Sequence, residues 1–75
     1  MRMLRDIAKE IKQDWKNVSV YARPYLDAME GLSTVNENYI AEDGRTIVLY
    51  FLANAGSWRG EVAKRVKQEL KKMVA

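Results

Sequence analysis

Five basic residues near the start of the chain recur at helical spacing. They lie three, four, three and four positions apart, which places them on one ridge of a helix about 20 Å long; this basic row consists of Arg2, Arg5, Lys9, Lys12 and Lys16. The opposite flank carries an acidic ridge of Asp6, Glu10 and Asp14. Like charges four residues apart destabilise an isolated helix by roughly 0.2–0.5 kcal/mol per pair. The basic row is therefore a candidate surface for an anionic partner or for the acidic ridge of another copy, and the alternative is a solvated helix edge.

A second basic set follows a short turn at Gly56 and Ser57, and it consists of Lys64, Arg65, Lys67 and Lys71. Two helices joined by such a turn are the outline of a DNA-reading helix-turn-helix. Two details weaken this match. Leu52 stands where a small residue is usual, and Glu61 puts a carboxylate where phosphates would repel it. The pattern favours an ordinary corner of a helical bundle over a DNA-reading motif.

Residues for catalysis are few. The chain has no cysteine and no histidine, which excludes thiolate and imidazole metal sites and histidine-based catalysis. Its serines have no recognisable base, no phosphate-binding loop follows Gly56, and the acidic residues of the 37–43 region are too sparse for a calcium loop. We expect no enzyme, no metal and no cofactor.

Two charges fall on apolar helix faces in this pattern. Asp14 lies within the first apolar stripe and Arg59 within the last. Because an unpaired buried charge is very costly, we expect a carboxylate to hold Arg59, with Asp14 the first candidate and Asp27 the second. Glu69, at an apolar edge, is expected to pair with a cation in the same way. The alternative is an exposed hot spot for another protein.

The two tryptophans, Trp15 and Trp58, are predicted to lie in the core. The hot-spot alternative would instead combine an exposed Trp58 with Arg59.

Apolar residues recur at steps of three and four in four segments. They predict an all-α bundle with helices at about residues 3–18, 20–31, 44–55 and 58–74. A long polar connector covers residues 32–43. Local signals predict the helix ends: Pro24 in a first turn, Gly31 as a stop, Asp43 as an N-cap, a left-handed Gly56 and a capping Ser57.

The segment RTIVLYFLANA, within residues 44–55, has the composition of a strand. We expect a helix, because no partner strand is recognisable elsewhere and a lone strand leaves its backbone unpaired. This helix would be apolar almost all round, so we expect it to be the central and most buried element.

Size and charge set the remaining bounds. The chain of 75 residues allows one domain, residues 1–75, with one small core. Its longest apolar run is too short to span a bilayer and no signal peptide is visible, so we expect a cytoplasmic protein with no membrane partner. The net charge of +3 permits an acidic partner without requiring one.

Three stretches carry a resemblance: PYLDAM, IVLYFLANA and SWRGEVAKRVKQEL. Together they resemble a small family of proteins associated with bacteriophages and integrated mobile elements of Gram-positive bacteria and actinobacteria, over residues 7–73. The resemblance implies an accessory protein that acts in the cytoplasm of a bacterial host cell. It implies no catalytic or binding residue.

The sequence thus predicts a non-enzymatic accessory protein that binds a host protein or nucleoprotein complex, for example an inhibitor of a defence system such as an anti-CRISPR. Two alternatives stay open. One is a small basic regulator that binds DNA, and the other is a structural protein that assembles with copies of itself into a homo-oligomer.

Overall fold

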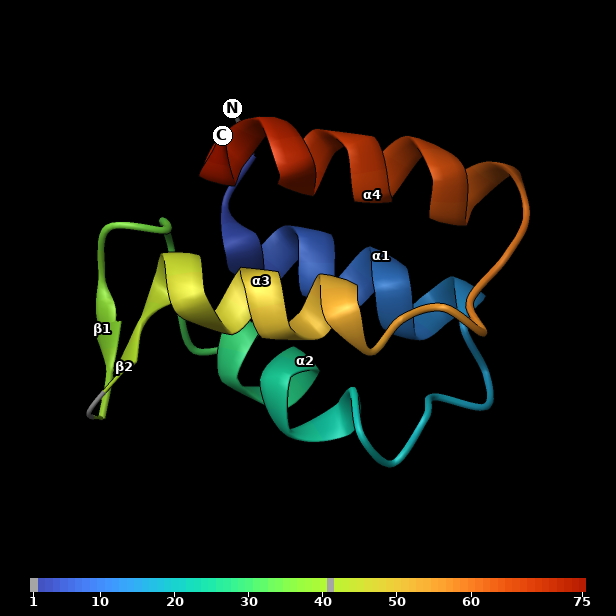
Figure 1. The fold of residues 1–75 in the computed structure, drawn as a ribbon, viewed down its shortest axis with the longest axis horizontal. Coiled ribbons are helices and arrows are strands. Elements are labelled where there is room, and N and C mark those ends of the chain that lie inside the picture. Colours follow the sequence, from blue (N-terminus) through green and yellow to red (C-terminus); the bar gives the residue numbers. More distant parts are fainter. Residues whose placement is uncertain (1, 41) are drawn as a thin grey trace.

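Helices make up most of the structure. The computed structural model describes residues 2–40 and 42–75, and the helices in those residues are α1 (Leu4–Asp14), α2 (Arg23–Met29), α3 (Gly44–Ala53) and α4 (Glu61–Val74) (Figure 1). Each lies inside one of the four predicted segments and is shorter than that segment. The four predicted helices are therefore confirmed, and their predicted ends were too generous.

The predicted connector holds a small sheet. Its strands β1 (Asn38–Tyr39) and β2 (Glu42–Asp43) pair in antiparallel register, Asn38 with Asp43 and Tyr39 with Glu42. The prediction of a purely all-α bundle is corrected on this point. Strands of two residues are too short to produce an alternating pattern in the sequence. Beside this pair Ile40 has a left-handed backbone (φ 59°), which is unusual for a β-branched residue.

Local chemistry explains why α3 begins where it does. The Asp43 carboxylate accepts a hydrogen bond from the Thr46 backbone N–H at 2.7 Å, which confirms the predicted N-cap. Gly44 follows because a Cβ there would lie 2.9 Å from the Thr34 carbonyl oxygen and from the Val35 Cα. The connector thus packs directly on the helix start, and only glycine leaves room for it.

The helices surround one core. In Figure 1, α3 lies in front of α1, with α4 above and α2 below, and both α1 and α3 contact α2 and α4. The spacing of buried residues on α1 and α4 gives each helix one apolar stripe toward this core. The largest fully buried side chains are Trp58, Phe51, Leu4, Ile7, Ile11, Leu26, Met29, Ile47 and Leu70.

The helix α3 is less buried than predicted. Ile47, Val48 and Phe51 face the core, but Leu49 is 47% exposed and Tyr50 is 46% exposed. The prediction that α3 is the most buried helix was therefore wrong for its outer face, although α3 contacts α2, α4 and β2 as a central helix would. The helix covers the core from one side, as α1 covers it from the other, so its outer face meets solvent although it is apolar.

The turn between α3 and α4 also differs from the prediction. The glycine with a positive φ is Gly60 (110°) rather than Gly56, and Gly60 is the N-cap of α4, with no side-chain cap from Ser57. Burial of Trp58 explains the difference. The chain turns toward the core at Trp58 and buries the indole. The chain turns away from the core again at Gly60, and α4 begins after this second turn.

In the described residues, no helix combines the length and the apolar character that crossing a membrane requires.

Candidate functional site

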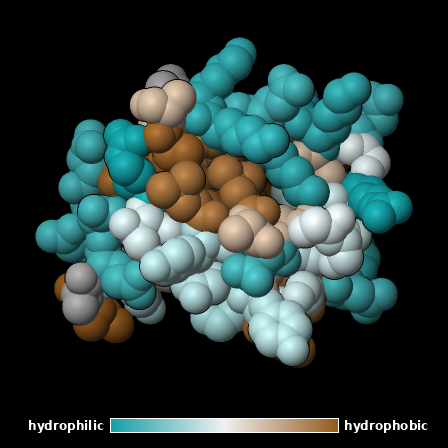
Figure 2. Space-filling model, in the orientation of Figure 1, coloured by the Kyte–Doolittle hydropathy of each residue, from teal (hydrophilic) through white to brown (hydrophobic). Residues whose placement is uncertain are grey.

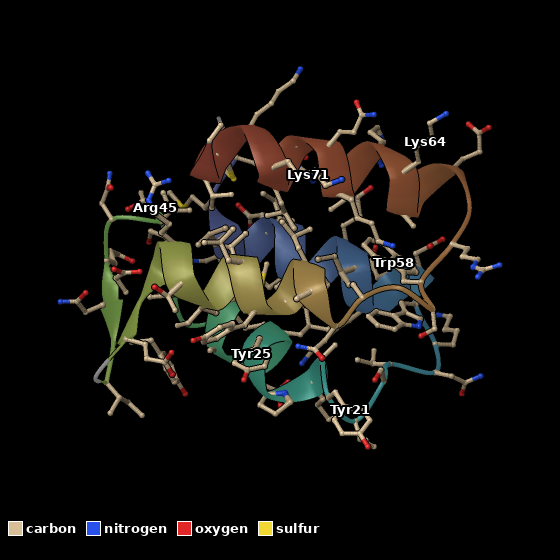
Figure 3. The ribbon with its side chains drawn as sticks, in the orientation of Figure 1. Tyr21, Tyr25, Arg45, Trp58, Lys64 and Lys71 are labelled. Carbon is tan, nitrogen blue, oxygen red and sulfur yellow. The ribbon has the colours of Figure 1, made fainter. Side chains whose placement is uncertain are left out.

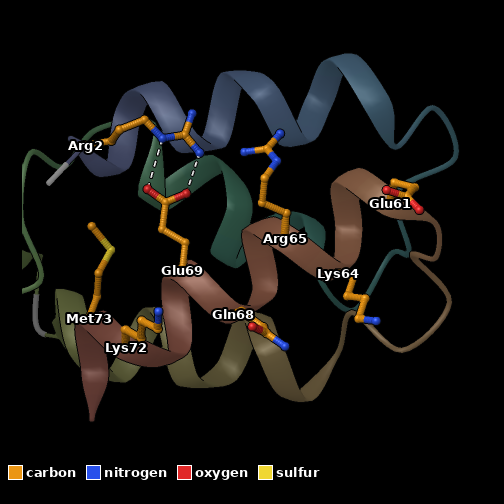
Figure 4. A pocket seen from close by; sticks show the side chains of 8 residues that line it. All are labelled: Arg2, Glu61, Lys64, Arg65, Gln68, Glu69, Lys72 and Met73. Carbon is orange, nitrogen blue, oxygen red and sulfur yellow. Dashed lines mark hydrogen bonds and ion pairs between the residues drawn. The ribbon is translucent and has the colours of Figure 1, made fainter.

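The basic row divides over two sides of α1. Arg2 lies before the helix and reaches toward α4, where its Nε and Nη2 donate to the Glu69 carboxylate at 3.0 and 2.6 Å (Figure 4). Its Nη1 lies 2.7 Å from Glu10 Oε1. These charge-assisted contacts raise the pKa of Arg2, with the Glu69 hydrogen bond as the largest cause. Arg2 therefore joins the start of the chain to both α1 and α4.

Lys12 faces the other neighbour, α2. Its Nζ donates to Asp27 Oδ1 at 2.8 Å and to Glu30 Oε1 at 2.6 Å. These two hydrogen bonds, the Asp27 bond first, raise the pKa of Lys12. Arg5 donates to the Ser33 hydroxyl. Three of the five cations of the basic row thus have partners inside the molecule, and Lys9 and Lys16 have none within the described residues.

The basic set on α4 divides in the same way. Arg65 donates to Glu10, and Lys67 donates to the Trp58 carbonyl oxygen at 2.6 Å, with its ammonium 5.8 Å from the centre of the Trp58 ring. Burial lowers the pKa of Lys67, and the positive charges of Lys71 and Arg59 lower it further. Lys64 and Lys71 are exposed (Figure 3).

The two tryptophans are buried against each other, as predicted. Trp15 and Trp58 stack with ring centres 5.8 Å apart, and both rings meet Phe51 edge-on. The Trp58 indole N–H donates to Asp14 Oδ2 at 2.8 Å. This bond satisfies the one polar atom of a side chain that is otherwise in the core.

The predicted clamp on Arg59 was wrong. Arg59 is exposed, because α4 begins two residues after it and the helical wheel does not apply to it. Asp14 accepts instead from Trp58, and Asp27 accepts from Lys12. The expected pairing of Glu69 with a cation is confirmed, and the cation is Arg2.

An open depression of about 880 Å³ lies along the outer side of α4 (Figure 4). Its lining residues are Arg2, Glu61, Lys64, Arg65, Gln68, Glu69, Lys72 and Met73. The hydrogen bond from Arg2 lowers the pKa of Glu69, which makes this carboxylate a weak proton acceptor. The lining residues include no hydroxyl and no thiol.

Apolar side chains gather on a different side, over α3. We name this surface the α3 face and define it as Leu49, Tyr50, Leu52 and Val74. Leu52 and Val74 are partly buried against the core, and Leu49 and Tyr50 are about half exposed. Figure 2 shows a hydrophobic patch between α4 and α3, with hydrophilic atoms above it. The Tyr50 ring also contacts Tyr25 of α2, with ring centres 5.3 Å apart.

Cations border the α3 face. Arg45 donates to the Val74 carbonyl oxygen at one end, and Lys71 projects from α4 along the upper side (Figure 3). No acidic residue occurs within α3, and both carboxylates of α4, Glu61 and Glu69, line the depression on its other side. The result is an apolar centre with a positive border.

Sequence reasoning missed this surface. The segment IVLYFLANA is apolar almost all round, and this composition predicts a helix that is buried on every side. The useful signal was the position of the helix in a bundle of only four: a helix on the outside of so small a core must expose one face. In α3 that exposed face includes Leu49 and Tyr50 rather than charged residues.

Comparisons with protein-family models, with curated proteins and with solved structures found no match to this chain. The resemblance to proteins of phages and mobile elements therefore stays a prediction.

Proposed function

We propose that this chain is a non-enzymatic binding protein that docks onto another protein through the α3 face. One observation carries the proposal: Leu49 and Tyr50 of α3 are 47% and 46% exposed, and Leu52, one helical turn after Leu49, is only partly buried. Contiguous apolar surface of this kind is characteristic of interaction sites. Tyrosine is also one of the residues most enriched among side chains that dominate binding energy.

The biological setting is part of the proposal. The resemblance to mobile-element proteins supports an accessory protein whose partner is a bacterial host protein or nucleoprotein complex, such as a component of a defence system. The lack of a recognisable catalytic constellation supports action by occupancy of a surface rather than by chemistry.

DNA binding is less well supported by the geometry. A reading helix needs its first turns free for the major groove. Here α4 starts with Glu61, and the cations Arg65 and Lys67 are engaged by Glu10 and by the Trp58 carbonyl. The remaining cations of α4 are split between two surfaces: Lys71 borders the α3 face, and Lys64 and Lys72 line the depression beside Glu61 and Glu69.

A capture experiment with two matched variants tests the proposed function. Leu49→Asp places a charge in the centre of the α3 face, and Val20→Asp places the same charge on the α1–α2 loop, where Val20 is 74% exposed. We expect the wild type and Val20→Asp to retain the same partner from a bacterial lysate. Leu49→Asp should retain at least about tenfold less, because burying an unpaired charge at an interface is costly.

Circular dichroism of all three proteins serves as the control for folding, and both substituted positions are exposed enough to tolerate the change. Equal recovery of the partner by Leu49→Asp and Val20→Asp would remove the α3 face from the proposal. Recovery of no partner by the wild type would count against a protein-binding function as a whole.

A further inference from the structure

We propose that the occupant of the α3 face is an acidic amphipathic helix of the partner protein. This inference rests on the proposed function and adds the secondary structure and the charge of the docked segment. Three features of the surface support it. Few unpaired main-chain groups are available on it, cations lie at its border, and its apolar side chains are half buried rather than projecting.

The α3 face offers few free main-chain groups to a bound segment. The α3 face consists of side chains from α3 and α4, whose main-chain groups are paired within the helices except near their C-terminal ends, where Arg45 donates to the Val74 carbonyl and Asn54 to the Tyr50 carbonyl. The strands β1 and β2 have two residues each and pair with each other. A bound segment must therefore satisfy its own backbone hydrogen bonds, and a helix does so while presenting apolar residues along one side.

Two cations, Arg45 and Lys71, lie at the border of the α3 face. Arg45 uses one N–H for the Val74 carbonyl and keeps further N–H donors for a carboxylate of the partner, although its charge also acts on Asp43 at the start of α3. Lys71 has no side-chain partner among the described residues and lies on the upper border (Figure 3). With no acidic residue in α3, the surface complements an occupant that carries Glu or Asp beside its apolar anchors.

Two other occupants fit less well. A symmetric pair of copies through the α3 face would bring each cationic border near the same border of the other copy, which is repulsive. An anionic membrane requires side chains that insert about 5–10 Å beyond the headgroups. Leu49 and Tyr50 are half buried, so they do not project as such wedges.

Designed peptides test the inference on the intact chain. The probe is a labelled helix of about 18 residues, roughly 27 Å long, with leucine along one face and glutamate on the other. One matched peptide has lysine in place of every glutamate, and another has a proline at its centre, which breaks the helix. Binding is measured by fluorescence anisotropy at low salt.

We expect the glutamate peptide to bind at least about tenfold more tightly than the lysine peptide or the proline peptide. Leu49→Asp should weaken this binding about tenfold or more, and Val20→Asp should leave it unchanged. Lys71→Glu should weaken it severalfold and reduce its salt dependence, whereas the matched reversal Lys9→Glu on α1 should do neither.

The outcomes separate this inference from the proposed function. If the captured partner depends on Leu49 but the glutamate peptide shows no preference over its two matched peptides, the inference fails and the proposed function stands. Leu49-dependent sedimentation with phosphatidylcholine–phosphatidylserine vesicles, in the absence of peptide binding, would assign the face to a membrane and overturn the inference. Loss of both the captured partner and the peptide would end both proposals.

Discussion

At the scale of single residues, the turn before α4 contains two glycines, Gly56 and Gly60. Both have room for a side chain, but their backbone dihedral angles differ. A Cβ added at Gly56 or at Gly60 would meet no atom within 4 Å. Gly60 has φ 110° and ψ −176°, a region that is essentially restricted to glycine, and Gly56 has no positive φ. A difference between alanine substitutions at these positions therefore reports backbone conformation alone.

We expect Gly60→Ala to lower the free energy of unfolding by about 1–3 kcal/mol. Gly56→Ala should change it by less than about 0.5 kcal/mol, as is usual for an exposed site without special geometry. Urea denaturation followed by circular dichroism measures both, provided that the slope with denaturant is unchanged. Equal losses in the two variants would show that the turn is not built around Gly60.

The success of residue-level prediction depended on how far apart the partners lie in the chain. The Asp43 cap on Thr46 spans three residues, so spacing alone predicts it. The bond from Trp58 to Asp14 joins residues 44 positions apart, and the choice of Asp14 over any other acceptor follows only from how the helices pack. The clamp on Arg59 failed for a related reason, because it assumed a helix start that the burial of Trp58 delays.

At the scale of elements, periodicity predicts the helices and not their outer faces. The type and order of all four helices were predictable, because their apolar stripes are long and regular. The strands β1 and β2 are too short to leave such a pattern. The exposure of Leu49 and Tyr50 depends on how many neighbours surround α3, which no periodicity within the helix contains.

Ion pairs connect α1 to α4. The lowered pKa values of their carboxyl groups, Glu10 and Glu69, predict that the folded chain loses stability in acid. The hydrogen bond from Arg65 is the main cause that lowers the pKa of Glu10, and that from Arg2 lowers the pKa of Glu69. Both carboxyls therefore bind protons less readily in the folded chain than in the unfolded chain, where their pKa is about 4.5. The stability that they contribute is present above pH 4.5 and is lost as the pH falls through the lower, folded pKa.

We expect the free energy of unfolding of the wild type to fall as the pH is lowered below about 4.5. Glu69→Gln should be less stable than the wild type at pH 7 and should show a shallower fall in acid. Asp6→Asn is the matched control on α1, since no side-chain partner of Asp6 occurs in the described part of the chain. Urea titrations across the acid range measure the effect, and parallel pH profiles for the wild type and Glu69→Gln would contradict it.

At the scale of the whole molecule, the charges are sorted by the packing. The net charge is only +3, but the carboxylates of the acidic ridge are largely used internally: Glu10 pairs with Arg2 and Arg65, and Asp14 accepts from Trp58. Among the described residues, the cations without a side-chain partner include Lys71 beside the α3 face, Lys9 on α1 and Lys16 in the turn after α1. The molecule therefore presents mainly positive charge to a partner, although its composition is nearly balanced.

This distribution predicts how salt affects self-association. If copies met through the α3 face, their apolar centres would attract and their cationic borders would repel. Salt screens only the repulsion, because the Debye length falls from about 30 Å at 0.01 M to about 3 Å at 1 M. We expect sedimentation velocity to show a monomer at low salt and weak, concentration-dependent dimers at high salt, which Leu49→Asp abolishes.

Pairing of the basic row with the acidic ridge of another copy would give the reverse, a dimer that salt dissociates and that Leu49→Asp leaves intact. The internal use of Glu10 and Asp14 makes that pairing unfavourable, since each carboxylate would first have to leave its present donor.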